Sequence, residues 1–201
     1  KDLNLTYTIN GKSETIQSKS AIAQRDLLIN DGSNQLTFTN KKANLVYVRV
    51  LNSGKLPLGQ ELTEQRGLSV SVVYKDLTGN KINISNLKQG QDFVASITVN
   101  NLKNENINDV ALTQLFPSGW EIINTRFTDF GEATTNQATY TDIRDNQVNY
   151  YFDLPQKGKQ GIKTFNVMLN ASFLGTYYLP GVQAEAMYDH DYLVRSKGQW
   201  I

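Results

Sequence analysis

The stretch Phe93-Val94-Ala95-Ser96-Ile97-Thr98-Val99 (FVASITV) places an apolar side chain at every second position. Residues two apart lie on the same face of an extended chain, so this pattern predicts a β-strand with one face in a core. Runs of the same kind occur on both sides of it, at 68–74, 110–116, 120–127, 148–154, 162–173, 177–187 and 192–194. No segment keeps apolar residues at helical spacing for more than about two turns. The sequence therefore predicts an all-β fold built from antiparallel sandwiches.

The N-terminal quarter shows the same character. Residues 3–9 alternate, and Asn10-Gly11 is a dipeptide typical of a two-residue hairpin turn. Further strands are predicted at 36–39 and at 44–51 (NLVYVRVL). Residues 20–29 (SAIAQRDLLI) fit either a helical turn or an irregular strand, and a strand is favoured because the neighbouring segments are strands.

A change of composition divides the chain. Residues 51–67 have little periodicity and frequent Gly, Pro and Asn, which is typical of a linker. We therefore predict two sandwich units joined by a linker at 56–67. Residues 1–55 form a small or incomplete sandwich, and residues 68–201 form a larger sandwich.

The overall composition excludes several classes of function. The 201 residues carry 20 basic and 19 acidic side chains, and the densest basic spot is Lys41-Lys42, so nucleic-acid binding is disfavoured. Apolar stretches are only a few residues long, so no membrane-spanning segment is expected. Without cysteine the chain has no disulfide and no thiolate ligand or nucleophile. It begins with Lys and shows no signal peptide, so we expect a fragment of a longer, exported protein.

Catalytic chemistry finds little support. The single histidine, His190, lies between Asp189 and Asp191 and could be a metal ligand or an oriented base. A polar loop between the last strands is favoured, because neighbouring residues of a strand point to opposite faces. Residues 142–145 could be a calcium loop, but an Arg144–Asp pair that fixes a loop is favoured. We predict no catalytic residue, cofactor or metal, and a hydrolase is disfavoured.

Aromatic residues are the remaining candidates for a site. They cluster at 150–152 and at 177–178, with tryptophans at 120 and 200. Exposed aromatics can stack on sugars, whereas consecutive aromatics on a strand divide between core and surface, and this second interpretation is favoured. The corner Phe116-Pro117-Ser118-Gly119-Trp120 is predicted to close one end of the sandwich with Trp120.

Four segments together resemble the C-terminal domain of bacterial alpha-2-macroglobulins. They are the corner at 115–122 (LFPSGWEI), the strand entry at 142–148 (DIRDNQV), the hairpin at 171–180 (ASFLGTYYLP) with Thr164-Phe165, and the tail EAMY at 185–188 with Arg195. Asn146 and Gln147 depart from the family pattern. The resemblance covers residues 68–201 and implies that they form a macroglobulin- or immunoglobulin-like sandwich. Residues 1–51 resemble the strands that return from the thioester domain to complete a small sandwich, whose partner strands lie upstream.

The resemblance implies a role in a protease trap. In such proteins a protease cuts a bait region, the molecule rearranges and the protease is caught, in some members through a thioester that needs a cysteine. This chain would then be a non-catalytic region that packs against the thioester-type domain and meets proteases only through the parent. It would reside in the periplasm or cell envelope, with a lipoprotein anchor on the parent. The expected interface residues are Tyr150, Tyr151, Tyr177, Tyr178 and Trp200. The alternative is a cell-surface carbohydrate-binding or adhesin-type sandwich.

Overall fold

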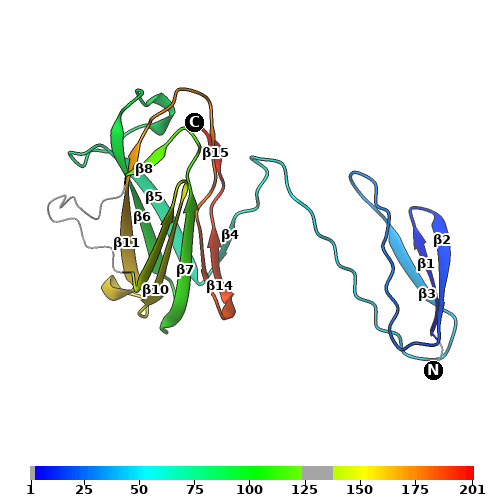
Figure 1. Cartoon of the computed structure of the whole chain (residues 1–201). Helices are drawn as coiled ribbons and strands as arrows, with labels where there is room; N and C mark the ends of the chain where they lie inside the picture. The colour runs from blue at the N-terminus through cyan, green and yellow to red at the C-terminus, as the bar shows by residue number, and fades with distance from the viewer. Residues whose placement is uncertain (1–2, 124–137) are drawn as a thin grey trace. The chain divides into compact units, whose positions relative to one another are not determined.

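The computed structural model describes residues 3–123 and 138–201, and within them every element is a strand or a short 3-10 helix (Figure 1). The chain divides into two compact units, Lys1–Gly54 and Lys55–Ile201. Each is described by itself. The antiparallel pairing throughout confirms the predicted all-β class.

The N-terminal unit is one three-stranded antiparallel sheet. Its strands are β1 (Leu3–Ile9), β2 (Lys12–Ser18) and β3 (Leu36–Asn40), in the order β2-β1-β3. Asn10 and Gly11 have φ angles of 46° and 83°, the left-handed values that a type I′ hairpin turn requires, so the predicted hairpin is confirmed.

Two predicted strands of this unit are wrong. Residues 20–29 and 44–51 are extended or irregular, and neither joins a sheet within the described chain. Alternation alone does not make a strand, because the backbone groups also need a neighbouring strand to receive their hydrogen bonds. Residues 44–51 have the side-chain pattern without that neighbour.

The C-terminal unit is a sandwich of two main sheets. The larger sheet has the order β4-β14-β13-β7-β10-β9 and the smaller β5-β6-β11-β8. A short pair, β12-β15, lies beside them. The bounds are β4 (Glu64–Arg66), β5 (Leu68–Lys75), β6 (Asp92–Asn101), β7 (Ile107–Leu115), β8 (Glu121–Ile123), β9 (Tyr140–Arg144), β10 (Gln147–Leu154), β11 (Ile162–Asn170), β12 (Tyr178–Leu179), β13 (Gln183–Ala186), β14 (Asp189–Arg195) and β15 (Gln199–Trp200), with 3-10 helices η1 (Ile84–Asn86) and η3 (Lys159–Gly161).

The core follows the alternation of strand β6. Phe93, Ala95, Ile97 and Val99 are all fully buried in the core that the two sheets enclose, as the pattern predicts. Strand β6 is also the centre of its sheet, with β5 and β11 paired along nearly its whole length. The backbone of β6 is thus hydrogen-bonded to a strand on each side, and one face of its side chains packs in the core.

Aromatic side chains fill the middle and one end of this core. In the middle, the Phe165 ring lies 4.5 Å from the ring of Tyr150 and 4.7 Å from that of Phe152, measured between centroids. At the end, Trp120 packs edge-on against Phe93 and its backbone N–H bonds to the Pro117 carbonyl. The prediction that Trp120 closes the sandwich end is confirmed.

The prediction that residues 56–67 are a linker is wrong for the last part of that segment. Its last part forms β4, which pairs with β14 at the edge of the larger sheet. Glu64-Gln65-Arg66 carries no apolar alternation, so the sequence gives no strand signal there. At Gly67, with φ of 62°, the chain passes from this sheet to β5 in the other, and a Cβ there would meet the Tyr192 ring at 2.5 Å.

Candidate interaction surfaces

The residues considered for catalysis or metal binding lie apart from one another. His190 is exposed near the start of β14, so it is on a strand and not in a loop. Within residues 3–123 and 138–201, no group of three or more His, Cys, Asp or Glu side chains could hold a metal ion.

The predicted Arg–Asp pair is present. The Arg144 Nε lies 3.0 Å from Asp142 Oδ2, and the Asn149 amide also donates to that oxygen at 3.3 Å. Both charged residues are on strand β9, so the pair stiffens a strand and not the loop that was predicted. Because Arg144 neutralises the carboxylate, this position suits structure better than cation binding.

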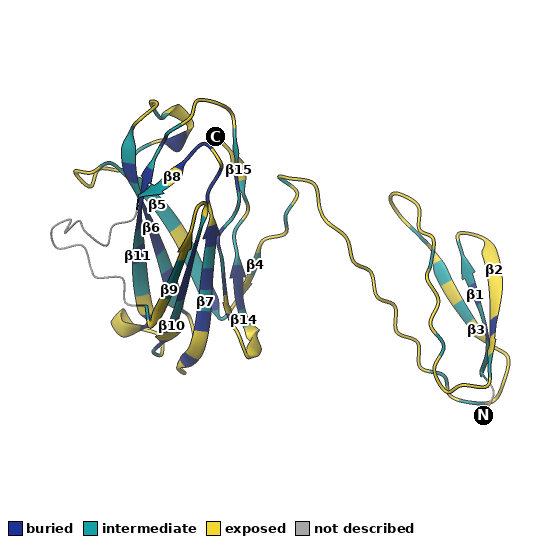
Figure 2. Ribbon diagram, viewed as in Figure 1, coloured by how far each residue is buried: buried dark blue, intermediate teal, exposed yellow. Residues whose placement is uncertain are grey.

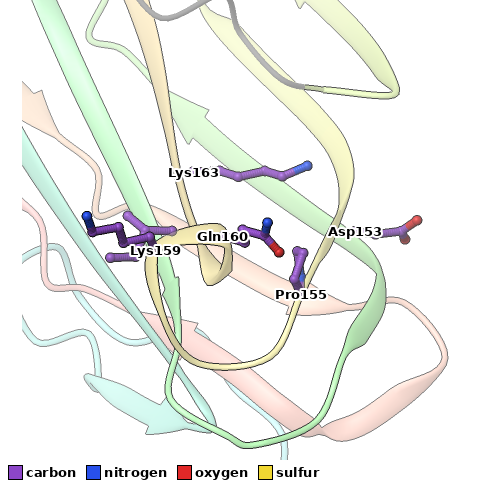
Figure 3. Close-up of a pocket in the computed structure, with 6 residues that line it drawn as sticks. Asp153, Pro155, Lys159, Gln160 and Lys163 are labelled. Carbon is purple, nitrogen blue, oxygen red and sulfur yellow. The ribbon is translucent and has the colours of Figure 1, made fainter.

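A hollow of about 500 Å³ opens between the end of β10 and the start of β11 (Figure 3). Its lining residues are Asp153, Pro155, Lys159, Gln160, Ile162 and Lys163. Figure 3 shows Asp153 and Lys159 pointing to opposite sides. The Asp153 carboxylate accepts the backbone N–H of Asp109, and the Lys163 ammonium lies 5.6 Å from the Phe152 ring centroid. The contacts of Asp153 and Lys163 are within the fold, and the charged groups of the hollow do not converge on a common point where a ligand could bind.

The two tyrosines of β10 face opposite sides, as predicted for consecutive aromatics. Tyr150 is 1% exposed, and burial raises its pKa to about 12. It has no surface to offer a partner and is removed from the interface candidates. Tyr151 is half-buried on the outer face, where its ring lies 5.8 Å from that of Tyr140 on β9.

Tyr177 holds a loop whose exposed residues, Phe173 and Leu174, were not among the predicted interface residues. Its ring lies against Gly119 and Gly175, where a Cβ would come within 2.3 and 2.8 Å of it, and its hydroxyl donates to the Leu174 carbonyl. The held loop exposes Phe173 by 58% and Leu174 by 73%. The sequence signal that could have indicated this exposed loop is the pair of large apolar residues directly before a glycine, Phe173-Leu174-Gly175.

Tyr178 and Trp200 pair within the unit. They lie opposite each other in the β12-β15 ladder, with ring centroids 5.3 Å apart and an edge-on angle of 67°. The Tyr178 hydroxyl binds residues Gly59 and Glu61, and Trp200 is exposed on its outer side. Of the five predicted interface residues, Trp200 is the one that is exposed, Tyr150 is buried, and Tyr151, Tyr177 and Tyr178 are half-buried.

A further tyrosine, Tyr192 on β14, ties this strand to the loop after β6. Its hydroxyl donates to Glu105 Oε1 at 2.5 Å, and this hydrogen bond, with burial, raises the pKa of Tyr192 to about 12. The turn before β14 exposes Met187 and Tyr188. This end of the sandwich therefore also presents apolar surface.

Exposed apolar side chains are most concentrated in the N-terminal unit, most of whose ribbon has the exposed colour in Figure 2. Among the described large apolar residues of this unit, only Leu5, Tyr7 and Ile16 are buried. The exposed members are Ile22, Leu28, Ile29, Leu45, Tyr47, Val48, Val50 and Leu51. A self-sufficient soluble domain rarely leaves so many exposed within so few residues. This surface is the strongest candidate for an interface.

No helix among the described residues is long and apolar enough to cross a membrane.

The family model and the curated relatives that match this chain all belong to the same protein family. The family model described as "Bacterial Alpha-2-macroglobulin MG10 domain" matches residues 67–191. The alpha-2-macroglobulin of Pasteurella multocida is 24% identical over 186 residues, covering 92% of this chain and 9% of that protein. The alpha-2-macroglobulin of Rickettsia conorii is 23% identical over 168 residues, covering 77% and 8%. This chain thus spans less than a tenth of the length of these curated relatives.

Solved structures show the same fold. Native Escherichia coli alpha-2-macroglobulin, determined by cryo-EM, matches with a TM-score of 0.66 at 16% identity, covering 98% of this chain and 13% of that one. Salmonella alpha-2-macroglobulin reacted with methylamine matches with a TM-score of 0.65 at 16% identity, covering 96% and 12%. The resemblance of residues 68–201 to this family is thereby confirmed. The chain belongs to the bacterial alpha-2-macroglobulin MG10 domain family.

Proposed function

We propose that this chain is a non-catalytic interaction region of a bacterial alpha-2-macroglobulin-like protease-trapping inhibitor. It packs against other domains of the parent protein, the thioester-type domain among them, and contributes to trapping through these contacts. Proteases are partners of the parent and not of this region alone. We place the parent in the periplasm or cell envelope, with a lipoprotein anchor, and this would be checked by cell fractionation.

The observation that carries the proposal is the unpaired strand-like segment at residues 44–51. Leu45 and Tyr47, on one side of it, are 79% and 88% exposed, although they alternate as the residues of a buried strand do. A strand-like chain with an apolar face and no neighbouring strand among the described residues is a template for pairing with another strand. The region is therefore suited to complete a sheet with a part of the parent outside this chain.

The C-terminal unit supplies a second kind of contact. Its apolar side chains reach the surface mainly at loop ends, as at Phe173, Leu174, Met187 and Tyr188. Interfaces between domains of one chain are of modest size and more polar than obligate ones, and a few apolar anchors are sufficient for them. The fixed loop at Tyr177 holds Phe173 and Leu174 ready for such a contact.

Carbohydrate binding receives less support. A flat platform on one strand needs aromatics two residues apart on the exposed face, and the residues two away from Tyr151 are Asn149 and Asp153. Its cross-strand neighbour, Tyr140, is tilted by 40° relative to it. The two rings do not form a common plane on which a sugar could stack.

A substitution in the unpaired segment tests the proposal. Tyr47→Asp should leave the melting temperature of this chain unchanged, because the side chain is almost fully exposed. In the full-length parent it should reduce protease trapping at least tenfold, since a carboxylate would be buried in the interface. Trapping is measured as the protease activity that remains on a small substrate but is lost on a large one.

Ser33→Asp is the matched control, because it adds the same charge at an exposed position of the same unit. It should trap as the wild type does. Full trapping by Tyr47→Asp would contradict the proposal.

A further inference from the structure

The segment at residues 55–63, called the strap here, precedes β4 and lies on the C-terminal unit with little apolar anchorage. Leu56, Leu58 and Leu62 are all exposed. Its only regular feature is a turn in which the Gln60 N–H donates to the Pro57 carbonyl at 3.0 Å, with Gly59 at φ of 84°. A hydrogen bond from the fourth residue to the first, with a positive φ at the third, is typical of a type II turn. Burial of apolar surface thus does not hold the strap in place.

Polar contacts to one tyrosine hold it instead. The Tyr178 hydroxyl accepts the Gly59 N–H at 3.0 Å and donates to Glu61 Oε1. The same carboxylate oxygen accepts the Gly59 N–H at 3.1 Å, so all three groups meet at one point. The tip of the turn and the side chain that follows it are therefore fixed by a single phenol.

The phenol itself is rigidly placed. Tyr178 is in the β12-β15 ladder, and the Trp200 ring packs edge-on against it. At Gly198 a Cβ would lie 2.4 Å from the Tyr178 hydroxyl, so only glycine leaves room for it there. The C-terminal strand pair is thus built around the position of this hydroxyl group.

We propose that Gly59, Glu61 and Tyr178 form a latch that reversibly docks the strap on the C-terminal strand pair. While the latch is closed, the chain that leads in from the N-terminal unit begins at a fixed point on the sandwich. When it opens, residues 55–63 join the free chain, and each adds at most about 3.5 Å of reach. The latch is a conformational device that controls the length of the connection between the units, and it is independent of the proposed function.

Two features make the latch easy to open. The strap leucines are already in water, so release exposes little further apolar surface. The second carboxylate oxygen, Glu61 Oε2, is enclosed and has no hydrogen-bond partner among the described residues. An enclosed acceptor without a partner is unfavourable, and opening returns it to water.

Charge keeps the latch closed at neutral pH. The hydrogen bond from Tyr178 holds the pKa of Glu61 below its ordinary value, and Lys197 acts in the same direction. Burial and the neighbouring Glu61 raise the pKa of Tyr178, which keeps its donating proton. A lowered carboxyl pKa stabilises the folded contact above the ordinary pKa of Glu, and this contribution is lost as the pH falls through the lowered value.

Hydrogen exchange of the full 201-residue chain tests the latch. In the wild type the Gly59 amide should exchange roughly tenfold more slowly than in an unstructured peptide, as expected for one net hydrogen bond. Tyr178→Phe removes only the hydroxyl oxygen and should bring the Gly59 rate to the unstructured value. Glu61→Gln removes the charge and should lie between the two.

Tyr177→Phe is the control, because it removes the neighbouring hydroxyl, which bonds to Leu174 and not to the strap. It should leave Gly59 exchange at the wild-type rate. Wild-type exchange at the unstructured rate would overturn the proposal, and so would unchanged protection in Tyr178→Phe.

A distance measurement separates docking from local protection. The chain has no cysteine, so spin labels can be placed at Leu56→Cys in the strap and Lys88→Cys in the sandwich, both exposed positions. The wild-type background should give one narrow distance distribution, and Tyr178→Phe a broader one. Identical distributions in the two backgrounds would show that the strap does not depend on the latch.

Discussion

Replacement of Phe165 by alanine is expected to lower the free energy of unfolding of the C-terminal unit by about 3–5 kcal/mol. The side chain is fully buried on β11, at the centre of the smaller sheet, and its ring contacts those of Tyr150 and Phe152 on the facing sheet. Its removal leaves a cavity between two layers that the strand pairing prevents from closing. Urea unfolding followed by tryptophan fluorescence measures the change, since Trp120 is in the same core.

Phe173→Ala provides the comparison, because it deletes the same side chain at a position that is 58% exposed. We expect it to cost less than about 1 kcal/mol. Equal effects of the two substitutions would mean that the sandwich core is not where the structure places it.

The contrast between these phenylalanines shows how far sequence patterns can locate a core. Alternation identified strand β6 and its buried face correctly, because a strand in the middle of a sheet has both its neighbours within the same unit. Phe165 belongs to a run of the same kind. Phe173 was assigned to the same predicted strand, 162–173, but β11 ends at Asn170 and Phe173 lies in the loop beyond it.

The same pattern failed where the neighbour is absent from the described chain. Residues 44–51 are rich in β-branched and large apolar residues, as β6 is, but no strand of the described chain pairs with them. Conversely, the sequence did not predict β4. Its three polar residues are held at the sheet edge by backbone hydrogen bonds, which a side-chain pattern does not show. A strand forms only where another strand pairs with it. The local sequence shows the side-chain pattern but does not show whether such a partner is present.

The candidate sites divide in a similar way. Consecutive aromatics on a strand were expected to face opposite sides, and Tyr150 and Tyr151 do so, but which of them points inward depends on register. The contact between Tyr178 and Glu61 joins residues 117 positions apart. No local pattern could predict it, because it depends on where the C-terminal strand pair is placed by the rest of the fold.

Residues 1–54, produced as a separate fragment, are expected to be largely unfolded, whereas residues 55–201 should fold and melt as the same unit does in the whole chain. The N-terminal unit has three strands in one sheet and buries only Leu5, Tyr7 and Ile16 among its large apolar residues. A single small sheet needs a well-covered apolar face to be stable alone, and chains of this size bury too little surface to offset the entropy of folding. Circular dichroism and the dispersion of amide NMR signals measure the outcome for both fragments.

The larger fragment is the internal control, because it contains both main sheets and a core of more than twenty buried residues. A folded 1–54 fragment with cooperative unfolding would show that its exposed apolar residues need no partner, and the proposed role of residues 44–51 would lose its main support. An unfolded 1–54 fragment that becomes ordered when the remainder of the parent is added would identify the missing partner directly. The exposed face of that segment would then be the surface that completes the sheet.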